Sequence, residues 1–223
     1  ACLLAEDIKR VTNKKIAVSS KKVSSEYAVV VGTVGHNAFI DQLVIEGQLD
    51  VSAISGGWEQ FVIKTIEAPV KGVKKVLVIA GCDRRGTAYG VFTLSEAMGV
   101  SPLYWWADVP VKKKSQLYVE SVNYISQAPS VQYRGIFIND EGWGITPWAG
   151  KTFDKELGDI GPKTYAKVCE LILRMKGNVL APAMHPSSGA FNKYPENKLV
   201  ADSYGIIMSS SHCEPLLFNN VTE

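Results

Sequence analysis

Apolar residues in the first half of the chain follow two repeating patterns, which predict helices and strands. Three segments carry apolar residues at helical spacing: residues 3–13, 36–47 and 85–99. Three others read as strands, of which the first and last are continuous apolar runs that predict burial: residues 26–32, 58–68 and 74–81. Asp83 can cap the third helix, while Gly47 and Gly99 end the second and third. We predict that the last two strands are neighbours in one sheet and that the third helix covers one face of it.

The second half of the chain alternates short apolar runs with helical patterns. The runs read as strands: residues 133–138, 179–184 and 206–208. Residues 161–178 and 195–205 read as the helices between them, each with a proline in its first turn and a glycine near its end. Strands that alternate with helices form a parallel sheet, since each crossover returns the chain to the same edge. A closed barrel and an open, doubly wound sheet both fit this order.

A boundary between the two patterns lies near residue 128. Pro129 is surrounded there by small and polar residues, which are typical of a linker. With 223 residues and 46% apolar composition, the chain is long enough to bury cores in two domains. We expect an α/β domain over residues 1–126 and a second domain over residues 131–223.

Polar clusters follow all three strands of the second domain, at the point where each strand ends. They are Asn139-Asp140-Glu141, His185, and His212-Cys213-Glu214. Such residues also favour strand ends for local reasons, because they bond nearby backbone groups. However, the carboxyl ends of parallel strands meet at one mouth, where binding and catalytic sites are built. The repetition at three strand ends therefore favours a site.

The two adjacent carboxylates, Asp140 and Glu141, cannot flank one bond as an acid and base pair unless the backbone turns between them. Neighbouring residues of an extended strand point to opposite faces. Hydrolysis of a sugar bond needs two carboxyl groups about 5 Å apart for retention, or about 6.5 to 9.5 Å apart for inversion. A partner must come from another strand end, and Glu214 is the candidate.

Aromatic side chains lie in the loops after the first two strands of this domain: Trp143, Trp148, Phe191 and Tyr194. Flat aromatic rings suit the apolar faces of sugars, but tryptophans in long loops also plug the underside of the loop. Both interpretations remain open for the two tryptophans.

A metal site and a cysteine nucleophile are weakly supported. Four residues near the second and third strand ends are of ligand type, namely His185, His212, Cys213 and Glu214, but they show no metal-binding spacing. The adjacency of Cys213 and His212 says nothing about a hydrogen bond between them. The four cysteines are far apart with no C-x-x-C pair, so we interpret them as free and mostly buried, although pairing depends on distances in the fold.

Charge and hydropathy exclude several partner classes. The chain has 24 basic and 22 acidic residues, and its lysine clusters are scattered, so we expect no nucleic-acid surface. No apolar run approaches the roughly 20 residues that cross a bilayer, and we expect no membrane partner. No G-x-G-x-x-G or P-loop motif follows a strand, which argues against nucleotide binding.

Three long segments closely resemble glycoside hydrolase family 115, the α-glucuronidases that remove glucuronic acid or its 4-O-methyl ether from xylan. They are YRGIFINDEGWGITPWA, DIGPKTYAKVCELILRMKGNVLAPAMHP and ADSYGIIMSSSHCEPLLFNN. A fourth, DRRGTAYGVFTLSEAMGVSPLYWWADVPV, is similar to the α/β domain that precedes the catalytic barrel in this and other barrel glycosidases. The resemblance covers most of the chain.

The resemblance implies an inverting, exo-acting hydrolase of α-1,2-linked uronic acid that needs no cofactor and has its site in a (β/α)8 TIM barrel. It implies that residues at the first strand end and the two that follow contact the substrate: Asn139, Asp140, Glu141, His185 and His212. Trp143 would line the pocket. Glu214 is the further candidate from the geometric argument above.

A whole barrel takes about 250 residues, so we expect this chain to be the N-terminal portion of the family's architecture, ending after the first barrel strands. No Arg or Lys stands beside the polar clusters to bind a uronate carboxylate, so that group is expected in the part of the protein outside this chain. Two alternatives stay open: another barrel glycosidase, such as a β-hexosaminidase-like enzyme, or a non-catalytic sugar-binding or interaction module.

The resemblance also implies the partner and the compartment. The substrate would be glucuronoxylan or its oligosaccharides, and any homo-oligomer would form through regions not in this chain. Because xylan lies outside the cell, we expect a periplasmic or secreted protein with an export signal outside this sequence.

Overall fold

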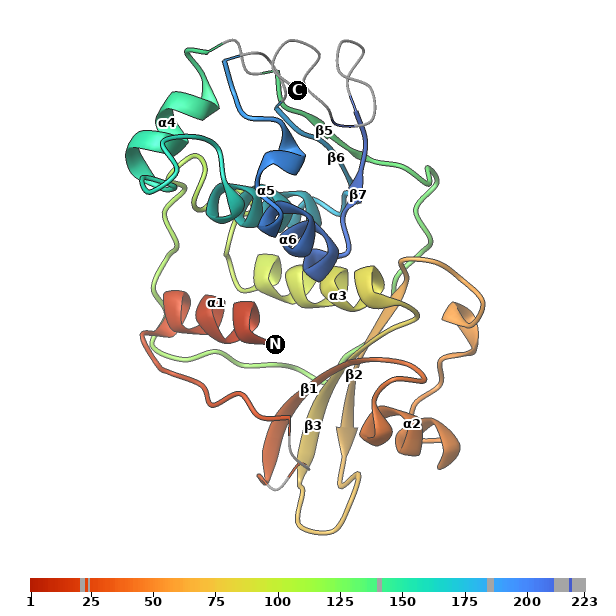
Figure 1. Cartoon of the computed structure of the whole chain (residues 1–223). Coiled ribbons are helices and arrows are strands. Elements are labelled where there is room, and N and C mark those ends of the chain that lie inside the picture. Colours follow the sequence, from red (N-terminus) through yellow and green to blue (C-terminus); the bar gives the residue numbers. More distant parts are fainter. Residues whose placement is uncertain (21–22, 24, 140–141, 184–186, 211–216, 218–223) are drawn as a thin grey trace. The chain divides into compact units, whose positions relative to one another are not determined.

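The computed structural model describes the whole chain except residues 21–22, 24, 140–141, 184–186, 211–216 and 218–223. The chain forms two compact units, Ala1–Ser130 and Val131–Glu223, which we call the N-terminal and C-terminal units (Figure 1). Each contains helices packed on a sheet, so the fold is mixed α/β as the sequence predicts.

The sheet of the N-terminal unit has the order β1-β3-β2-β4. Its strands are β1 (Tyr27–Thr33), β2 (Phe61–Glu67), β3 (Lys75–Gly81) and β4 (Asn123–Ile125). β3 is parallel to β1 and antiparallel to β2, and β2 is antiparallel to β4. The prediction that β2 and β3 are neighbours is confirmed. The sequence did not predict β4, because three residues are too few to show a period.

The prediction that β1 is a buried strand is wrong for much of its length. β1 stands at the edge of the sheet, where Tyr27 is 64% and Val29 45% exposed. Only Val30 is buried, on the face that α2 (Ala38–Ile45) covers. A continuous apolar run does not tell an edge strand from a central one, because that depends on which strands pair beside it.

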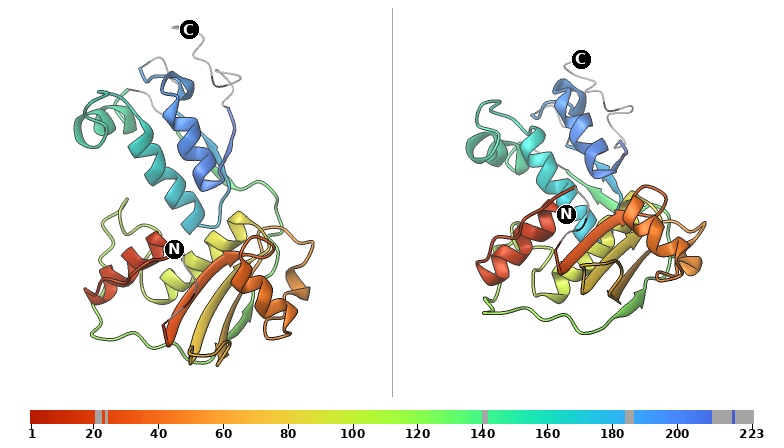
Figure 2. Two further views of the ribbon diagram at one scale, coloured as in Figure 1. Left: turned by 60° about the horizontal axis from the view of Figure 1, so that its bottom comes forward. Right: turned by 90° about the horizontal axis from the view of Figure 1, so that it is seen from below.

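Helices cover both faces of this sheet. α2 lies on one face and α3 (Arg84–Ala97) on the other (Figure 2), and α1 (Cys2–Thr12) packs against α3. As predicted, Asp83 caps α3, since its Oδ1 accepts the N–H of Gly86 at 2.7 Å. Gly90 lets α3 approach closely, because a Cβ there would lie 2.6 Å from Cγ2 of Ile79 in β3.

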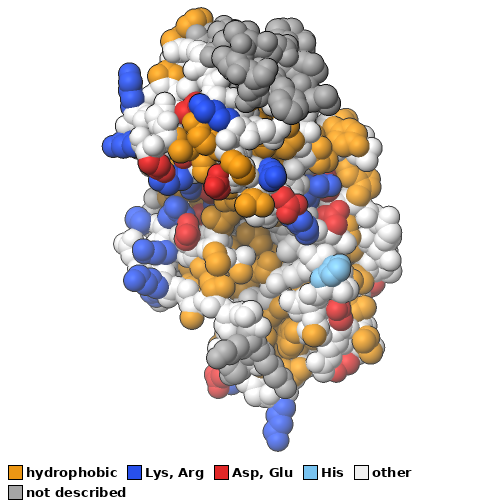
Figure 3. Space-filling view, viewed as in Figure 1, with side chains coloured by type: hydrophobic (Ala, Val, Ile, Leu, Met, Phe, Trp, Pro, Cys, Tyr) orange, Lys and Arg blue, Asp and Glu red, His pale blue; other side chains and the backbone are white. Residues whose placement is uncertain are grey.

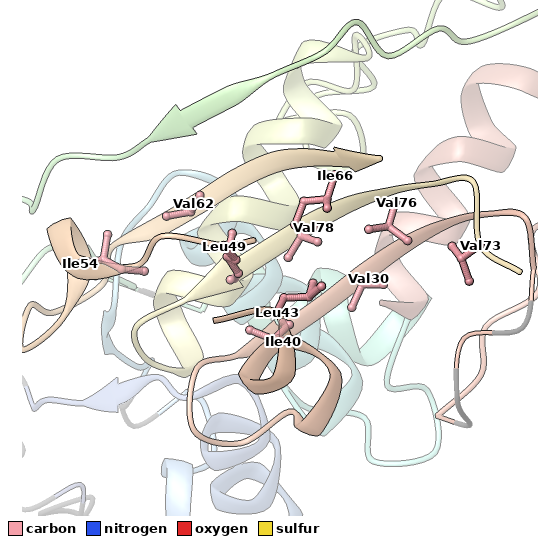
Figure 4. Packing of buried hydrophobic residues seen from close by; sticks show 11 residues of the cluster. Val30, Ile40, Leu43, Leu49, Ile54, Val62, Ile66, Val73, Val76 and Val78 are labelled. Atoms are coloured by element: carbon pink, nitrogen blue, oxygen red, sulfur yellow. The ribbon is translucent and has the colours of Figure 1, made fainter. Parts of the chain in front are cut away.

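The core between α2 and the sheet is a cluster of aliphatic side chains (Figure 4). The chain between α2 and β2, which includes the 3-10 helix Ser52–Ile54, supplies two of its members. The cluster consists of Val30, Ile40, Leu43, Leu49, Ile54, Val62, Ile66, Val73, Val76, Val78 and Ala80. Burial of this apolar area is the main stabilisation of the N-terminal unit.

The C-terminal unit has the predicted order of strand, helix, strand, helix and strand. Its sheet is β5-β6-β7, parallel throughout, formed by β5 (Gly135–Phe137), β6 (Val179–Ala181) and β7 (Ile207–Met208). α5 (Pro162–Arg174) and α6 (Glu196–Tyr204) connect them and pack on each other. The sequence missed α4 (Ile145–Thr152) and the 3-10 helix Phe191–Lys193.

The buried face of α5 is the face that helical spacing predicts. Its five predicted members are all at most 3% exposed: Tyr165, Val168, Cys169, Ile172 and Leu173. Burial raises the pKa of the Cys169 thiol to about 12. The three cysteines that the structure describes are free, but Cys2 is exposed and Cys82 half-buried, so burial of most cysteines was a wrong expectation for these three.

The surface agrees with the balanced charge of the sequence. Acidic and basic side chains occur together on the face shown in Figure 3. None of the helices in the described ranges combines the length and apolarity required to cross a bilayer.

Candidate functional site

The carboxyl ends of β5, β6 and β7 define one edge of the C-terminal unit, which we call the carboxyl edge. Beyond β5, the N–H of Ile138 still bonds the carbonyl of Ala181 at 2.9 Å, and beyond β7 the N–H of Ser209 bonds the carbonyl of Leu180 at 2.8 Å. This pairing holds the chain extended up to Asn139, which is exposed. The structure therefore places Asn139 at the carboxyl edge, as predicted.

Five of the predicted site residues lie outside the described residues: Asp140, Glu141, His185, His212 and Glu214. Cys213 does too. Their roles therefore remain predictions. Trp143 is described, and 80% of it is exposed, which leaves its ring open to a ligand.

The other aromatic candidates separate into surface and core. Trp148 is not in a loop but on α4, where it stacks on Phe153 with ring centroids 6.5 Å apart. Phe191 is 1% exposed and packs edge-to-face on Tyr165 at 5.0 Å, so it belongs to the core of the unit. Tyr194, the other aromatic candidate in the loop after β6, is half-buried near the carboxyl edge.

Asp154 holds the beginning of α5 in place. It is fully buried, and its carboxylate accepts the backbone N–H groups of Gly161, Lys163 and Thr164 together with the Thr164 hydroxyl. The first N–H groups of a helix have no partner within the helix, and here the Asp154 side chain supplies one. This bond set fixes the connection between β5 and α5.

Asp159 joins two connections of the carboxyl edge. Oδ1 accepts the N–H of Ile160 at 2.8 Å, and the N–H of Gly189 lies 3.2 and 3.1 Å from its two oxygens. Oδ2 also accepts from Lys193 Nζ at 3.2 Å and from the Tyr194 hydroxyl at 3.1 Å. The segment before α5 is thereby bonded to the segment before α6.

The electrostatics of this cluster keep Lys193 charged. Its hydrogen bond to Asp159, and then its contact with Tyr194, raise the pKa of Lys193 above the ordinary 10.5. Burial is the main cause that raises the pKa of Tyr194, and the charge of Asp159 adds to it, while Lys193 acts in the opposite direction.

Sequence reasoning missed Asp159 and Lys193, and it placed no basic group on the carboxyl edge. The two residues are 34 positions apart, and neither stands in a motif. The one sequence signal for this cluster was Tyr194, which the sequence places as an aromatic residue in the loop after the second strand. Only the folded connections bring the three side chains together.

The N-terminal unit has a reversal of strand order that often marks a nucleotide site, but its own side chains fill it. α2 follows β1 on one face and α3 follows β3 on the other, and ligands favour such crevices. Here three atoms of the Asn37 side chain lie within 2.9 Å of the position that a Cβ on Gly32 would take. Thr87 Oγ1 lies 2.7 Å from Thr33 Oγ1. We assign no nucleotide to this crevice.

No group of three or more metal-ligating side chains occurs among the residues that the structure describes. The described part of the carboxyl edge contains instead a cation paired with a carboxylate, amide and hydroxyl groups and an exposed indole. These groups suit hydrogen bonding and stacking to a sugar.

Comparison with known proteins identifies the family. Residues 126–223 match the family model of glycosyl hydrolase family 115. Over 97% of its length, the chain is similar to a solved structure of a family GH115 4-O-methyl-α-glucuronidase, BtGH115A, with specificity for decorated arabinogalactans. The identity is 37% and the TM-score 0.81, and the chain spans 27% of the length of that protein. A comparison with curated proteins gives no match.

The match confirms the resemblance seen in the sequence. The family model covers the three segments that carry it, from YRGIFINDEGWG to SSSHCEPLLFNN. The similarity to the solved structure extends through the N-terminal unit as well, because it includes 97% of the chain. Residues 126–223 of this chain therefore belong to glycosyl hydrolase family 115, a family of glycoside hydrolases, and the chain as a whole is similar to a solved member of that family.

Proposed function

We propose that this chain is the N-terminal portion of an α-glucuronidase. The observation that carries the proposal is the 37% identity, over 97% of the chain, to a 4-O-methyl-α-glucuronidase. The complete enzyme is an inverting, exo-acting hydrolase that releases α-1,2-linked glucuronic acid or 4-O-methylglucuronic acid from xylan. On the same ground we propose a periplasmic or secreted place of action, which cell fractionation would test.

The proposal includes a (β/α)8 barrel that begins in the C-terminal unit. Three parallel strands connected by helices support it, since this is the repeating unit of such a barrel. β5 also supports it, because Ile136 is 41% and Phe137 50% exposed in a strand of apolar residues. Further strands of the complete protein would cover the exposed side chains of Ile136 and Phe137. The corresponding domains are residues 1–126 and 131–223.

The mechanism that we propose uses an acid and a base on different strand ends. Inversion needs their carboxyl groups about 6.5 to 9.5 Å apart, with a water between base and sugar. Asp140 and Glu141 bind substrate or position this water, and Glu214 is the candidate partner across the mouth. Asn139, His185 and His212 bond sugar hydroxyls or stabilise developing charge, and the exposed ring of Trp143 stacks on the substrate.

A second substrate deserves equal testing, because BtGH115A has specificity for decorated arabinogalactans. For an α-glucuronidase on either polysaccharide, the uronic acid is the part that an exo-acting pocket encloses. The neutral chain is then the part that distinguishes them.

The first test is release of free glucuronic acid or its 4-O-methyl ether by the full-length protein. We expect release from glucuronoxylan, from decorated arabinogalactan, or from both. The chain of residues 1–223 is measured in parallel, and we expect it to release neither, because later barrel strands complete the site. Absence of release by the full-length protein from both polysaccharides would contradict the proposal and favour another glycosidase or a sugar-binding module.

The predicted site residues are tested in the same assay. We expect Asp140→Asn and Glu141→Gln to lower kcat by at least about tenfold. Side chains that transfer protons in the transition state accelerate a reaction by about 10²-fold to 10⁴-fold. Glu156→Gln is the control, because Glu156 is an exposed carboxylate of the same unit that pairs with Lys163. A fall of no more than twofold for both Asp140→Asn and Glu141→Gln would remove these residues from the site.

A further inference from the structure

Lys193 is a cation on the carboxyl edge whose position the fold determines. It ends the 3-10 helix in the connection from β6 to α6, and Asp159 lies in the connection from β5 to α5. In a parallel α/β unit both connections lie beyond the carboxyl ends of the strands. Lys193 Nζ donates to Asp159 Oδ2 at 3.2 Å, so the cation is tied to the edge that also carries Asn139.

The carboxylate of Asp159 does not serve Lys193 alone. The carboxylate also accepts from the backbone N–H groups of Ile160 and Gly189 and from the Tyr194 hydroxyl. Its negative charge is therefore shared among several donors. Lys193 carries three N–H groups, of which one bonds Asp159 and another is used by the contact with Tyr194. Its side chain is 51% exposed, so the remaining donor reaches solvent or a ligand.

The surroundings hold the lysine stem in one place. A Cβ on Gly189 would lie 2.7 Å from Lys193 Cδ and 2.5 Å from Asp159 Oδ2, so the Gly189 backbone lies directly against the lysine stem and the carboxylate. On another side, Nζ lies 5.2 Å from the centroid of the Tyr194 ring, a favourable cation–π distance. Half-exposed ion pairs add little to stability, so folding alone does not account for this placement.

We propose that Lys193 binds the carboxylate of the uronic acid, and that Asp159 and Tyr194 position its side chain. The inference rests on the proposed α-glucuronidase function and names the group that recognises the acidic sugar. A uronic acid differs from its neutral hexose in one carboxylate, which a fixed ammonium recognises by charge and hydrogen bonding. The raised pKa of Lys193 keeps it cationic wherever the sugar is ionised.

The test compares binding of glucuronate and of its uncharged methyl ester by calorimetry, with the full-length protein and three variants. Lys193→Met removes the charge and keeps an apolar stem, while Lys193→Arg restores a cation. Lys198→Met, at an exposed lysine of α6, controls for the loss of a positive charge elsewhere in the unit. We expect the wild-type protein to prefer glucuronate by about tenfold, as a charge-assisted hydrogen bond predicts.

We expect Lys193→Met to abolish this preference without changing the affinity for the ester, and Lys193→Arg and Lys198→Met to retain most of it. Equal weakening for both ligands would show that Lys193 only supports the loop and would overturn the inference. An unchanged preference in Lys193→Met, or no preference in the wild type, would overturn it too. Release of uronic acid, measured separately, decides the proposed function, so a preference without release would contradict that function alone.

Discussion

Replacing Glu170 by leucine is expected to lower the free energy of unfolding of the C-terminal unit by about 3–5 kcal/mol. Glu170 is 3% exposed on α5, and its two oxygens accept from Arg174 Nε at 2.8 Å and from Lys167 Nζ at 2.9 Å. Arg174 is itself only 3% exposed. Without the carboxylate, a guanidinium would stay buried after losing this anion, which is among the most costly changes in a protein interior.

The double variant Glu170→Leu with Arg174→Met separates this cause from lost packing. Removing both charges together leaves neither ion of this pair buried, so we expect the double variant to be more stable than Glu170→Leu alone. Hydrogen exchange of the α5 peptide during urea unfolding measures the C-terminal unit, and the β3 peptide reports the other unit. A loss below about 1 kcal/mol in the single variant, or a larger loss in the double variant, would contradict the argument.

Acid should weaken the same interaction. Burial raises the pKa of Glu170, but the hydrogen bond from Lys167 and the charge of Arg174 outweigh burial, and the pKa lies below the ordinary 4.5. A lowered folded-state pKa contributes stability that is complete above the unfolded-state value and is lost as pH falls through the folded-state value. The stability difference between wild type and Glu170→Leu should therefore shrink below pH 4.5.

Replacing Asp154 by alanine is expected to destabilise the C-terminal unit by about 3–5 kcal/mol, because several buried donors lose one acceptor together. Each buried donor left without a partner costs about 1–3 kcal/mol. The donors are the N–H groups of Gly161 and Thr164 and the Thr164 hydroxyl, with the N–H of Lys163 beside them. Fraying should begin at the start of α5, where peptide exchange would be fastest.

Asp154→Asn and Glu156→Gln complete the Asp154 experiment. Asparagine keeps one oxygen but turns an N–H group toward the donors, so it should recover only part of the loss. Glu156→Gln should leave stability near that of the wild type, because its pair with Lys163 is solvent-exposed. If Asp154→Ala were as stable as Glu156→Gln, the carboxylate would not be the cap of α5.

The candidate site was predictable where it depended on the ends of elements. Asn139 stands at a strand end that the sequence places correctly, because an apolar run followed by polar residues marks the end of a strand. The position of Trp148 on α4 was not predictable, since the helix is short and begins at a glycine without a side-chain cap. For the same reason, the sequence predicts a loop position for Trp148.

The sequence by itself determined the local pattern of this protein. The buried face of α5, the cap of α3 by Asp83 and the order of elements in the C-terminal unit all follow from spacings of a few residues. Such spacings reflect the geometry of one helix or strand, which neighbouring residues decide. Long, ordered segments also sufficed to show the family.

Only the tertiary structure decided which elements stand at an edge and which distant side chains meet. β1 is exposed because β3 pairs with it on one side and, among the described residues, no strand pairs with it on the other. Asp159 and Lys193 come from connections 34 residues apart, and their contact depends on how two crossovers fold onto one sheet edge. Periodicity contains no information about such long-range contacts, because it describes each element alone.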